Sequence, residues 1–476
     1  MRLGALIPGL GQGPEEAGVT GFAIDHRKVA PGTVFGAFQG LRVNGEDFIP
    51  DAVRAGAVAV VARPEAQVEG AAHIADDEPR AAFARLAARF FGPFPATAVA
   101  VTGTNGKTST VEMTRQLWRM SGLNAASVGT LGVTTADERV TTGLTTPDVV
   151  TFLSNVAGLA REGVTHLAFE ASSHGLTQYR TEGLRVAAAA FTNLSRDHLD
   201  YHGDMAAYLT AKLRLFSEVL APDGAAVVWA DDPESARVVD LARERGNRLV
   251  TVGELGATLR LVGREPTLLG QGLTIEADGA VHKVKLPLIG AYQAANALVA
   301  AGLVIATGGD VAPTLQALGR LQPVRGRLER AAIARFGAPV YVDYAHTPDA
   351  LEAAIGALKP HAGGRLIVVL GAGGDRDPGK REPMGQVAAA RADRVIVTDD
   401  NPRTEDPAAI RREVLKGAGG GATEIGDRRE AIAAAIAWAG PEDIVLIAGK
   451  GHEQGQVVGD LVLPFDDVAV ARECAG

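Results

Sequence analysis

The stretch AVAVTGTNGKTST, residues 98–110, contains the pattern that decides the fold. It begins with a short apolar run of residues that favour β-strands, and the helical pattern TVEMTRQLWRM, residues 110–120, follows it. Between the two lies a glycine loop, Gly103–Gly106, which leads into Lys107. A strand, a glycine loop and a helix in this order predict a phosphate-binding loop at the start of a parallel α/β unit.

The residue types of this loop suit ATP and magnesium. Glycines let backbone N–H groups approach phosphate oxygens, Lys107 can reach the β- and γ-phosphates, and the Thr108 hydroxyl can bind magnesium. Val101 stands where the strict pattern has its first glycine, but the strand and helix around the loop support the prediction. The alternative is a glycine turn beside a surface lysine. The predicted ATP contacts from this loop are Gly103, Thr104, Asn105, Gly106, Lys107, Thr108 and Ser109.

The composition of the 476-residue chain favours a globular protein of several domains. Lys plus Arg total 47 and Asp plus Glu total 56, so the net charge of −9 argues against a general nucleic-acid-binding protein. The single cysteine, Cys474, cannot form an internal disulfide, which fits a reducing cytoplasm. No apolar run approaches about 18 residues and the first residues carry no secretory signal, so we expect a cytoplasmic protein without a membrane span.

Three regions follow one another along the chain. An Ala/Arg-rich helical stretch, Ala81–Phe91, ends at GPFPAT, residues 92–97, whose prolines and glycine cannot continue a helix. Apolar runs and helical patterns then alternate, which is typical of a parallel α/β sheet. We therefore predict an α/β protein of three domains: a smaller N-terminal α/β domain (1–93), a central phosphate-loop domain with a parallel sheet (94–322) and a C-terminal Rossmann-like, doubly wound domain (323–476).

Four apolar runs of the last region each end in polar or glycine residues. They are APVYVDYAH (338–346), LIVVLGAGGDRD (366–377), RVIVTDDNPR (394–403) and IVLIAGKGHE (444–453). In doubly wound sheets, ligands bind at the carboxyl ends of the strands. The four polar ends should therefore line a ligand site.

Three further candidates lie in the central region. Glu170 follows an apolar run, and a carboxylate at a strand end downstream of a phosphate loop can hold magnesium, although such a residue is more often a solvated charge. His198 lies in FTNLSRDHLDYH (191–202), where two histidines among charged residues suggest ligands; a lone histidine is more often a satisfied surface or core residue. Lys212, in AYLTAKLRLF (207–216), is by pattern an ordinary helix lysine beside an apolar stripe.

Seven motifs, in this order along the chain, resemble those of one enzyme family. They are TGTNGKTST, EASSHGL, FTNLSRDHLDYHG, VDYAHTPDAL, LGAGGDRDPGKR, TDDNPR and AGKGHE. The chain resembles the Mur ligases, which join amino acids to UDP-N-acetylmuramic acid, and most of all their diaminopimelate-adding members. The resemblance covers nearly the whole chain and is weakest in the first 90 residues. It implies an ATP- and magnesium-dependent ligase of peptidoglycan synthesis that joins meso-diaminopimelate to UDP-N-acetylmuramoyl-L-Ala-D-Glu through an acyl phosphate. We expect a monomer, although the sequence does not give the oligomeric state.

The resemblance also implies roles for single residues. Lys107, Glu170, His198 and Lys212 match catalytic groups, and Lys212 matches a lysine that is carbamylated in the family. The implied magnesium ligands are Thr108, Glu170, His198 and Lys212 as its carbamate. Asn296 matches an ATP contact, with Gln293 nearby where Asn is commoner.

Two further sets of residues match substrate contacts of the family. The UDP-substrate contacts are His26, Thr145, Thr146, Ser172, Gln178 and Arg180, with His26 standing where many members have serine. The implied diaminopimelate contacts are Arg376, Asp400, Asn401, Pro402, Arg403, Gly449 and Glu453. In the family, members that add diaminopimelate have arginine at the last position of Asp-Asn-Pro-Arg. A guanidinium can hold the second carboxylate of diaminopimelate with two parallel hydrogen bonds.

Several alternatives stay open from the sequence alone. Arg403 could be a surface arginine after a proline turn. The chain could be a lysine-adding relative, a ligase like folylpolyglutamate synthetase, or a nucleotide-gated regulatory protein without ligase activity. The base that deprotonates the incoming amine is not identified, although His346 in VDYAHTPD is a candidate.

Overall fold

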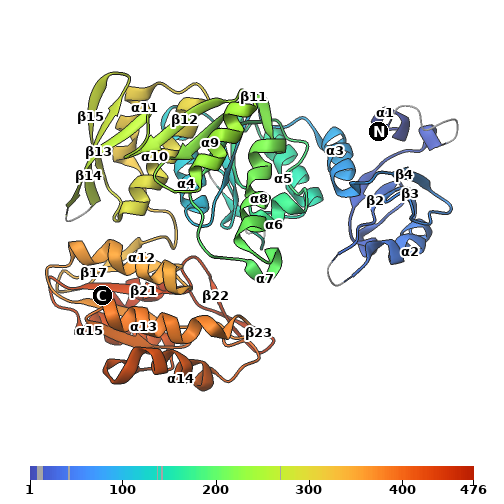
Figure 1. Ribbon diagram of the computed structural model, residues 1–476. Coiled ribbons are helices and arrows are strands. Elements are labelled where there is room, and N and C mark those ends of the chain that lie inside the picture. The colour runs from blue at the N-terminus through green and yellow to red at the C-terminus, as the bar shows by residue number, and fades with distance from the viewer. Residues whose placement is uncertain (8–13, 41–42, 137, 141–142, 268–269) are drawn as a thin grey trace. The chain divides into compact units, whose positions relative to one another are not determined.

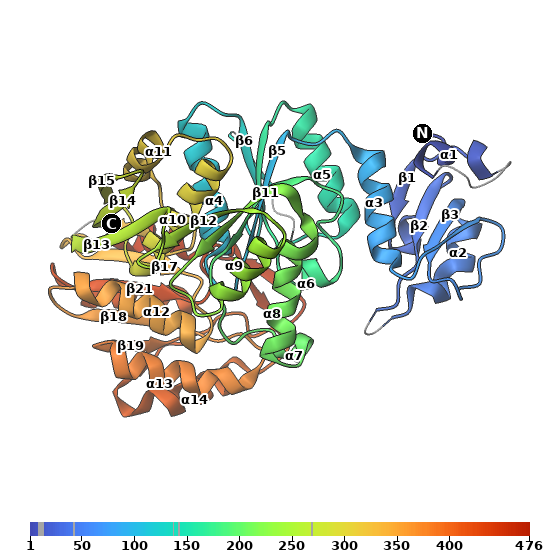
Figure 2. The ribbon, with the colours of Figure 1, turned by 45° about the horizontal axis from the view of Figure 1, so that its top comes forward.

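The structure is a computed structural model that describes residues 1–476 apart from 8–13, 41–42, 137, 141–142 and 268–269 (Figures 1 and 2). It divides into two compact units. The first contains Met1–Arg260 and Leu298–Asp310, and the second contains Leu261–Ala297 and Val311–Gly476. Strand β13 (Leu259–Thr267) and helix α10 (Ala291–Ala306) each contain residues of both units.

The N-terminal part of the first unit is a small parallel sheet with helices, coloured blue in Figure 1. Its strands are paired in chain order: β1 (Gly21–Ala23), β2 (Thr33–Gly36), β3 (Ala57–Ala62) and β4 (Ala72–Ala75). Its helices are α1 (Leu3–Leu6), α2 (Ile49–Arg54) and α3 (Pro79–Phe91). On α3 the buried ring of Phe83 packs edge-on against Phe22 and Phe38, at centroid distances of 5.3 and 5.4 Å. The predicted helix and the small α/β domain are thus both present.

The central sheet of the first unit has the phosphate-loop strand near its middle. Its strands in this unit follow the order β13-β12-β11-β10-β5-β9-β6-β7-β8, and the sheet continues beyond β13 with β14 (Gly270–Ala277) and β15 (Ala280–Leu286) of the second unit. Their bounds are β5 (Thr97–Thr102), β6 (Ala125–Gly129), β7 (Gly132–Thr134), β8 (Arg139–Val140), β9 (His166–Glu170), β10 (Val186–Phe191), β11 (Leu220–Trp229) and β12 (Arg248–Gly253). The helices are α4 (Lys107–Met120), α5 (Val149–Arg161), α6 (Ser173–Thr177), α7 (Leu199–His202), α8 (Met205–Arg214) and α9 (Ser235–Glu244).

The prediction of a parallel sheet holds from β13 to β6, and the edge beyond β6 differs. Strands β7 and β8 pair antiparallel to their neighbours. Only residues 130 and 131 separate β6 from β7. A connection of two residues can form a hairpin but is too short for the crossover that a parallel pair needs. The sheet is therefore mixed at this edge.

The second unit contains a β-hairpin and a doubly wound sheet. The hairpin consists of β14 (Gly270–Ala277) and β15 (Ala280–Leu286). The sheet has the order β16-β17-β21-β18-β19-β20, with β16 antiparallel to its neighbour. Its strands are β16 (Glu329–Ile333), β17 (Pro339–Asp343), β18 (Leu366–Leu370), β19 (Arg394–Val397), β20 (Thr423–Glu424) and β21 (Ile444–Ala448).

Two hydrophobic clusters cover the two faces of this sheet. Alternate residues of a strand point to opposite faces. Thus Val368 of β18 packs with the cluster formed by α12 (Pro348–Leu358), α13 (Arg381–Arg391) and α14 (Pro407–Ala418). Its neighbour Ile367 packs with the cluster of α15 (Arg428–Trp438) and α16 (Asp467–Ala475). Helices on both faces confirm the predicted doubly wound domain.

Two elements remain. Helix α11 (Val311–Ala317) follows α10, and a two-stranded hairpin, β22 (Gly455–Val458) and β23 (Leu461–Pro464), follows the last sheet strand. Among the helices of the described residues, none has both the length and the apolar character that crossing a membrane requires.

Candidate active site

The predicted phosphate loop lies between β5 and α4. Gly106 precedes the first helical residue with φ 86°, a left-handed conformation that favours glycine. A Cβ on Gly103 would collide with the hydroxyl of Thr192. The Lys107 ammonium folds back over the loop and donates to the carbonyl oxygens of Gly103 and Thr104, at 2.9 and 2.7 Å. The backbone N–H groups at the start of α4 and this lysine form the surroundings that a phosphate requires.

A second loop, Thr192–Ser195, holds the phosphate loop in shape. The Asn193 carboxamide accepts a hydrogen bond from the Asn105 backbone N–H at 2.9 Å, and the Thr192 hydroxyl donates to the Asn105 carbonyl at 2.6 Å. The Thr104 hydroxyl donates to the Ser195 carbonyl at 3.2 Å and accepts from the Ser195 N–H at 3.0 Å. The FTNLS motif therefore fixes the backbone of the phosphate loop.

Lys212 on α8 is a buried lysine directed at the same loop. Its side chain is 1% exposed, and its Nζ donates to the Gly103 carbonyl oxygen at 2.7 Å and lies 4.1 Å from the centre of the Tyr208 ring. Burial, and then the positive charge of Lys107, hold the pKa of Lys212 well below its usual value. A lysine in these surroundings favours the neutral amine.

Glu170 lies at the carboxyl end of β9, the strand beside β5. It is 2% exposed, and its carboxylate accepts hydrogen bonds from the Thr130 N–H at 2.7 Å and the Thr130 hydroxyl at 3.2 Å. A Cβ on Gly129 would collide with this carboxylate, so glycine is needed at that position. The carboxylate is fixed at the strand end and is not a solvated surface charge.

The predicted UDP-substrate residues of the central domain form one hydrogen-bonded network beside Glu170. The Thr146 hydroxyl contacts the Glu170 carbonyl at 2.9 Å and the Ser172 hydroxyl at 3.0 Å. Arg180 donates to the Thr146 carbonyl at 2.7 Å and to the Gln178 carboxamide oxygen at 2.8 Å. The Thr145 hydroxyl lies 3.0 Å from that of Thr130, which itself contacts Glu170. Burial lowers the pKa of Arg180.

His26 lies in the N-terminal part of the first unit and is not linked to this network by any contact among the described residues. It follows Asp25 in a short 3₁₀ turn, and its ring stacks on that of Phe48 at a centroid distance of 4.3 Å. The Arg27 guanidinium beside Asp25 lowers the pKa of that carboxyl to about 2. The stacked ring occupies the position where a serine hydroxyl was expected from the family pattern.

In the second unit, the four polar strand ends meet at one edge of the sheet. Strands β17, β21, β18 and β19 are parallel neighbours in this order, and the four motifs follow directly from their carboxyl ends. At the end of β17, burial raises the pKa of Asp343 to about 6. The His346 Nδ1 lies 2.7 Å from the Tyr344 carbonyl oxygen and must carry the hydrogen of that bond. Burial lowers the pKa of His346, so the ring is neutral near pH 7 with its Nε2 as the basic nitrogen.

The ends of β19 and β21 share a buried polar network. Asp400, Asn401 and Glu453 are brought together around the fully buried Lys450. The Asn401 amide donates to the Glu453 carboxylate at 2.8 Å. Gly449 has φ 117°, and a Cβ there would lie 2.6 Å from an Asp400 carboxylate oxygen, so the two loops approach closely because this residue is glycine.

Arg403 has a left-handed backbone, with φ 51°. Such a conformation costs a non-glycine residue about 1–3 kcal/mol and persists where surrounding contacts impose it. Here the Arg403 N–H donates to the Val457 carbonyl at 3.0 Å, and the Gly459 N–H donates to the Arg403 carbonyl at 2.7 Å. The Arg403 Nη1 donates to the Gly374 carbonyl at 2.7 Å. Hairpin β22–β23 therefore fixes the backbone from which this guanidinium extends.

Sequence models of three Mur ligase domains match this chain. The Mur ligase family catalytic domain matches residues 18–91, the Mur ligase middle domain matches residues 101–304, and the Mur ligase glutamate ligase domain matches residues 326–451. The chain is 61% identical over 478 residues to UDP-N-acetylmuramoyl-L-alanyl-D-glutamate–2,6-diaminopimelate ligase of Zymomonas mobilis, covering 99% of this chain and 98% of the relative. This chain belongs to the Mur ligase family.

Other relatives agree with this placement in the Mur ligase family. The ligase of the same name from Bradyrhizobium diazoefficiens is 53% identical, covering 94% of this chain and 93% of that protein. A solved structure of a ligase of this name is 33% identical with a TM-score of 0.75, covering 100% of this chain and 98% of that one. Mycobacterium tuberculosis folylpolyglutamate synthase, 20% identical with a TM-score of 0.64 over 78% of this chain, shares the fold alone.

The structure brings together three sets of the residues that the Mur ligase motifs imply. One is the phosphate loop with Lys212, the second is the network of Glu170 with the threonines, and the third joins Asp400, Asn401, Gly449 and Glu453. Asn296 lies in the second unit, where its amide contacts Gln293 at 3.5 Å, so its part in ATP binding stays a prediction. Arg376 is exposed on the loop after β18.

The implied magnesium ligands differ in the atoms that they offer to a cation. Magnesium prefers oxygen ligands. Thr108 and Glu170 supply oxygen, whereas the half-exposed His198 supplies a nitrogen that lies 3.4 Å from Asp197. No group of three or more His, Cys, Asp or Glu side chains in the described part of the chain could hold a metal ion. The oxygens of Thr108 and Glu170 fit magnesium, which also takes phosphate and water oxygens. A carbamate on Lys212 would add further oxygen ligands, and the lowered pKa of Lys212 favours the neutral amine that forms one.

Some residues of these sites were missed by the sequence analysis. Thr130 and Asn193 hold functional groups in place. Thr130 belongs to no pattern that the sequence could single out, whereas Asn193 stands within the recognised motif FTNLSRDHLDYHG but was not named. Lys450 stands within a motif that was recognised, yet it was not named. Lys380, whose pKa burial lowers, lies near enough to Asp400 to be influenced by its charge.

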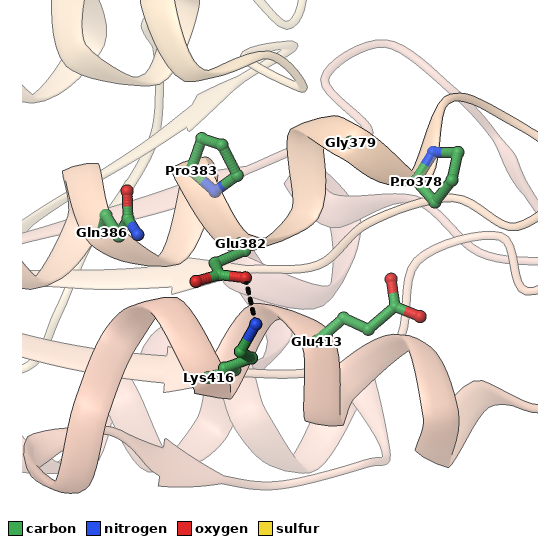
Figure 3. A pocket seen from close by; sticks show the side chains of 7 residues that line it. All are labelled: Pro378, Gly379, Glu382, Pro383, Gln386, Glu413 and Lys416. Carbon is green, nitrogen blue, oxygen red and sulfur yellow. Dashed lines mark hydrogen bonds and ion pairs between the residues drawn. The ribbon is translucent and has the colours of Figure 1, made fainter.

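A separate pocket of about 430 Å³ lies between α13 and α14 and holds none of the candidate residues (Figure 3). Its charged side chains include Glu382 and Lys416, which form an ion pair at 2.7 Å. Lys416 is largely exposed, with 72% of its side chain accessible. This surface lysine provides a useful contrast to the buried lysines of the candidate site.

Proposed function

We propose that this chain is an ATP-dependent ligase of peptidoglycan synthesis that joins meso-diaminopimelate to the D-glutamyl γ-carboxylate of UDP-N-acetylmuramoyl-L-Ala-D-Glu. The observation that carries the proposal is the 61% identity over nearly the full length to a ligase named for these substrates. The Asp-Asn-Pro-Arg loop, held by hairpin β22–β23, supports the same amino acid.

In the first step, the γ-carboxylate attacks the terminal phosphorus of ATP, and an acyl phosphate and ADP form. Two anions must approach each other in this step, so positive charge and N–H donors are needed where they meet. Lys107 and the backbone N–H groups at the start of α4 would hold the phosphates. Magnesium would neutralise more of the phosphate charge. Its ligands would be Thr108, Glu170, His198 and the Lys212 carbamate.

In the second step, the amine of diaminopimelate attacks the acyl carbon, and inorganic phosphate leaves. The amine must lose a proton to become a nucleophile. His346 is a candidate acceptor for that proton, because its neutral ring has Nε2 as the basic nitrogen. Holding the reactants in line supplies much of the remaining acceleration.

Recognition of the far end of diaminopimelate would use both signs of charge. Arg403 would hold the distal carboxylate, Glu453 the neighbouring ammonium, and Arg376 the other carboxylate. Among the described residues the Arg403 guanidinium donates through Nη1, to the Gly374 carbonyl, which leaves Nη2 and Nε to bind a carboxylate. With L-lysine this arginine would lack its partner.

The three predicted domains would then share the three substrates. Residues 1–93 would bind the UDP-sugar, with His26 near the nucleotide, and the network of Thr145, Thr146, Ser172, Gln178 and Arg180 in the central domain (94–322) would bind the muramoyl-dipeptide. The central domain would also bind ATP, through the phosphate loop and Asn296. Residues 323–476 would bind the amino acid. We also propose that the protein is a cytoplasmic monomer.

A phosphate-release assay tests this function. Purified protein is incubated with ATP, magnesium, UDP-N-acetylmuramoyl-L-Ala-D-Glu and meso-diaminopimelate, and each component is omitted in turn. Phosphate release should need all of them, and mass spectrometry should detect the muramoyl-tripeptide. A regulatory protein would release phosphate without an amino acid, and a folylpolyglutamate synthetase would need a folate and glutamate instead.

A further inference from the structure

Lys450 is the fully buried lysine of the second unit, and the proposed reaction has not used it. It stands in the loop after β21, between Gly449 and Glu453, and its side chain is 0% exposed. Lysine is almost never fully buried unless it is paired. Because no part of it reaches the surface, its ammonium serves other protein groups and does not touch a ligand directly.

The Lys450 ammonium contacts three side chains. It donates to the Asn401 Oδ1 at 2.9 Å and to the Glu453 Oε2 at 3.2 Å, and it lies 3.8 Å from the Asp400 Oδ1. Asp400 and Asn401 follow β19, whereas Glu453 follows β21. One buried cation thus joins two loops that the sequence separates by about 50 residues.

These contacts fix which way the Asn401 amide faces. Its Oδ1 accepts from the Lys450 Nζ and from the Val457 N–H, the latter at 2.9 Å. An oxygen that accepts two donors leaves the Nδ2 group to point the other way, where it donates to the Glu453 Oε2 at 2.8 Å. The lysine therefore sets the direction of the amide, and the amide in turn holds the glutamate.

The Glu453 carboxylate is held through one oxygen only. Its Oε2 accepts from both Asn401 and Lys450. Within the described part of the chain its Oε1 accepts no hydrogen bond, and the side chain is 33% exposed. One oxygen is thus anchored in the protein while the other remains available for a ligand cation.

We propose that Lys450 is a positioning and specificity residue of the amino-acid site, which rests on the proposed function. It orients Glu453 toward the ammonium at the far end of diaminopimelate and offsets one of the two negative charges of Asp400 and Glu453. The far end of diaminopimelate bears an ammonium and a carboxylate, whereas that of L-lysine bears an ammonium alone. A pocket that loses the Lys450 charge becomes more negative and favours the ligand with the greater positive charge.

The test is steady-state kinetics of Lys450→Met, which keeps the length of the side chain and removes its charge. The KM for meso-diaminopimelate should rise about 10- to 100-fold, as expected for a lost hydrogen bond to a charged group. The KM values for ATP and the UDP-muramoyl-dipeptide should stay within about twofold of the wild type. The preference for diaminopimelate over L-lysine, as a ratio of kcat/KM, should fall about tenfold.

Lys416→Met is the matched control, because it removes an exposed lysine from the same unit. It should leave all three KM values unchanged. If Lys450→Met shifts the KM of every substrate alike, or leaves the amino-acid preference unchanged, the residue has a structural role alone and the proposal is wrong. If instead the wild-type protein shows no phosphate release that depends on diaminopimelate, the proposed function itself fails.

A double-variant comparison tests whether Lys450 acts through Glu453. In the Glu453→Gln background, Lys450→Met should raise the KM for diaminopimelate by less than about threefold, because the group it positions has already lost its charge. Independent, multiplying effects would overturn the proposal. Should Lys450→Met not fold, Asn401→Asp keeps the oxygen that accepts from Lys450 and removes the donor to Glu453. In that variant the KM for diaminopimelate must rise while the KM for ATP stays the same. If the KM for diaminopimelate does not change, the proposal is wrong.

Discussion

Lys107 and Lys212 donate to the same carbonyl oxygen, that of Gly103, yet their surroundings suit them for different tasks. Lys107 lies at the start of a helix, where an anion is favoured and a cationic side chain can meet it. Lys212 is buried, and the charge of Lys107 helps to lower its pKa. Burial therefore favours the neutral amine at Lys212, whereas Lys107 stands beside the backbone N–H groups that begin α4.

The role of Lys107 can be tested by truncation. Lys107→Ala should lower kcat by about 100-fold or more, because in the proposed reaction this charge would stabilise the transferred phosphoryl group. The fold should be unaffected, since Lys107 contacts the loop carbonyls and does not belong to the hydrophobic core. Phosphate release and circular dichroism measure the two effects. Near-normal turnover would rule out the ATP assignment.

The carbamate on Lys212 has a spectroscopic test. Protein equilibrated with ¹³C-labelled bicarbonate near neutral pH should show a carbamate carbon signal, which Lys212→Ala should lack. The same variant should lose activity by about 100-fold, and a short carboxylate such as acetate should restore part of it by replacing the missing anion. An unmodified ammonium on Lys212 in bicarbonate would argue against the hypothesis.

The raised pKa of Asp343 predicts how stability depends on pH. Burial raises this pKa from 3.8 to about 6, so the folded state holds the proton more tightly than the unfolded state. Its contribution to stability is full below about pH 4 and falls by about 3 kcal/mol as the pH rises to about 6.

Asp343→Asn cannot titrate and should lack this dependence. The thermal midpoint of the wild type should therefore fall relative to that of the variant between pH 4 and 6. Differential scanning calorimetry of both proteins across this range measures the effect. Midpoints that change in parallel would show that Asp343 ionises normally in the folded protein.

Single residues were predictable where a local pattern carries the chemistry. The phosphate loop was predicted from its strand, its glycines and its helix. By pattern alone Lys212 was an ordinary helix lysine. The local pattern could not reveal its burial, because the lysine is buried against Gly103, which lies 109 residues earlier in the chain. Lys450 follows a strand as many surface lysines do, and only the contact of two strand ends reveals that it is buried.

At the scale of elements, hairpin β22–β23 contacts the Asp-Asn-Pro-Arg loop, residues 400–403, from one side. It contacts this loop through backbone groups of Val457 and Gly459 and through the Gln456 amide, which donates to the Asp400 carbonyl at 2.7 Å. The hairpin carries exposed apolar side chains, so its sequence resembles neither a core strand nor a typical loop. That explains why the sequence analysis did not predict it, while the buried strands β17, β18, β19 and β21 were apparent.

Removing one backbone donor tests the hairpin. Val457→Pro deletes the N–H that donates to the Asn401 carboxamide at 2.9 Å. The amide should lose its fixed direction, and the KM for diaminopimelate should rise about tenfold, with the KM for ATP unchanged. Asp460→Ala, in the exposed turn of the same hairpin, is the control. A variant with wild-type kinetics would show that the hairpin does not support the site.

At the scale of the whole molecule, the alternation of strands and helices predicted three α/β regions with the correct fold class. The family models match the same three regions in the same order. The exact domain boundaries stay a prediction. The antiparallel edge formed by β7 and β8 was not foreseen, because strands of three and two residues leave no long apolar run in the sequence.

The choice of amino acid tests the central claim most directly. Catalytic efficiencies with meso-diaminopimelate and with L-lysine are measured for the wild type and for Arg403→Ala, under saturating ATP and UDP-muramoyl-dipeptide. An unpaired guanidinium in a partly desolvated pocket costs roughly 2–4 kcal/mol, so the wild type should prefer diaminopimelate by about 30- to 1000-fold. Arg403→Ala should lose most of this preference. Equal efficiency with the two amino acids in the wild-type protein would contradict the account.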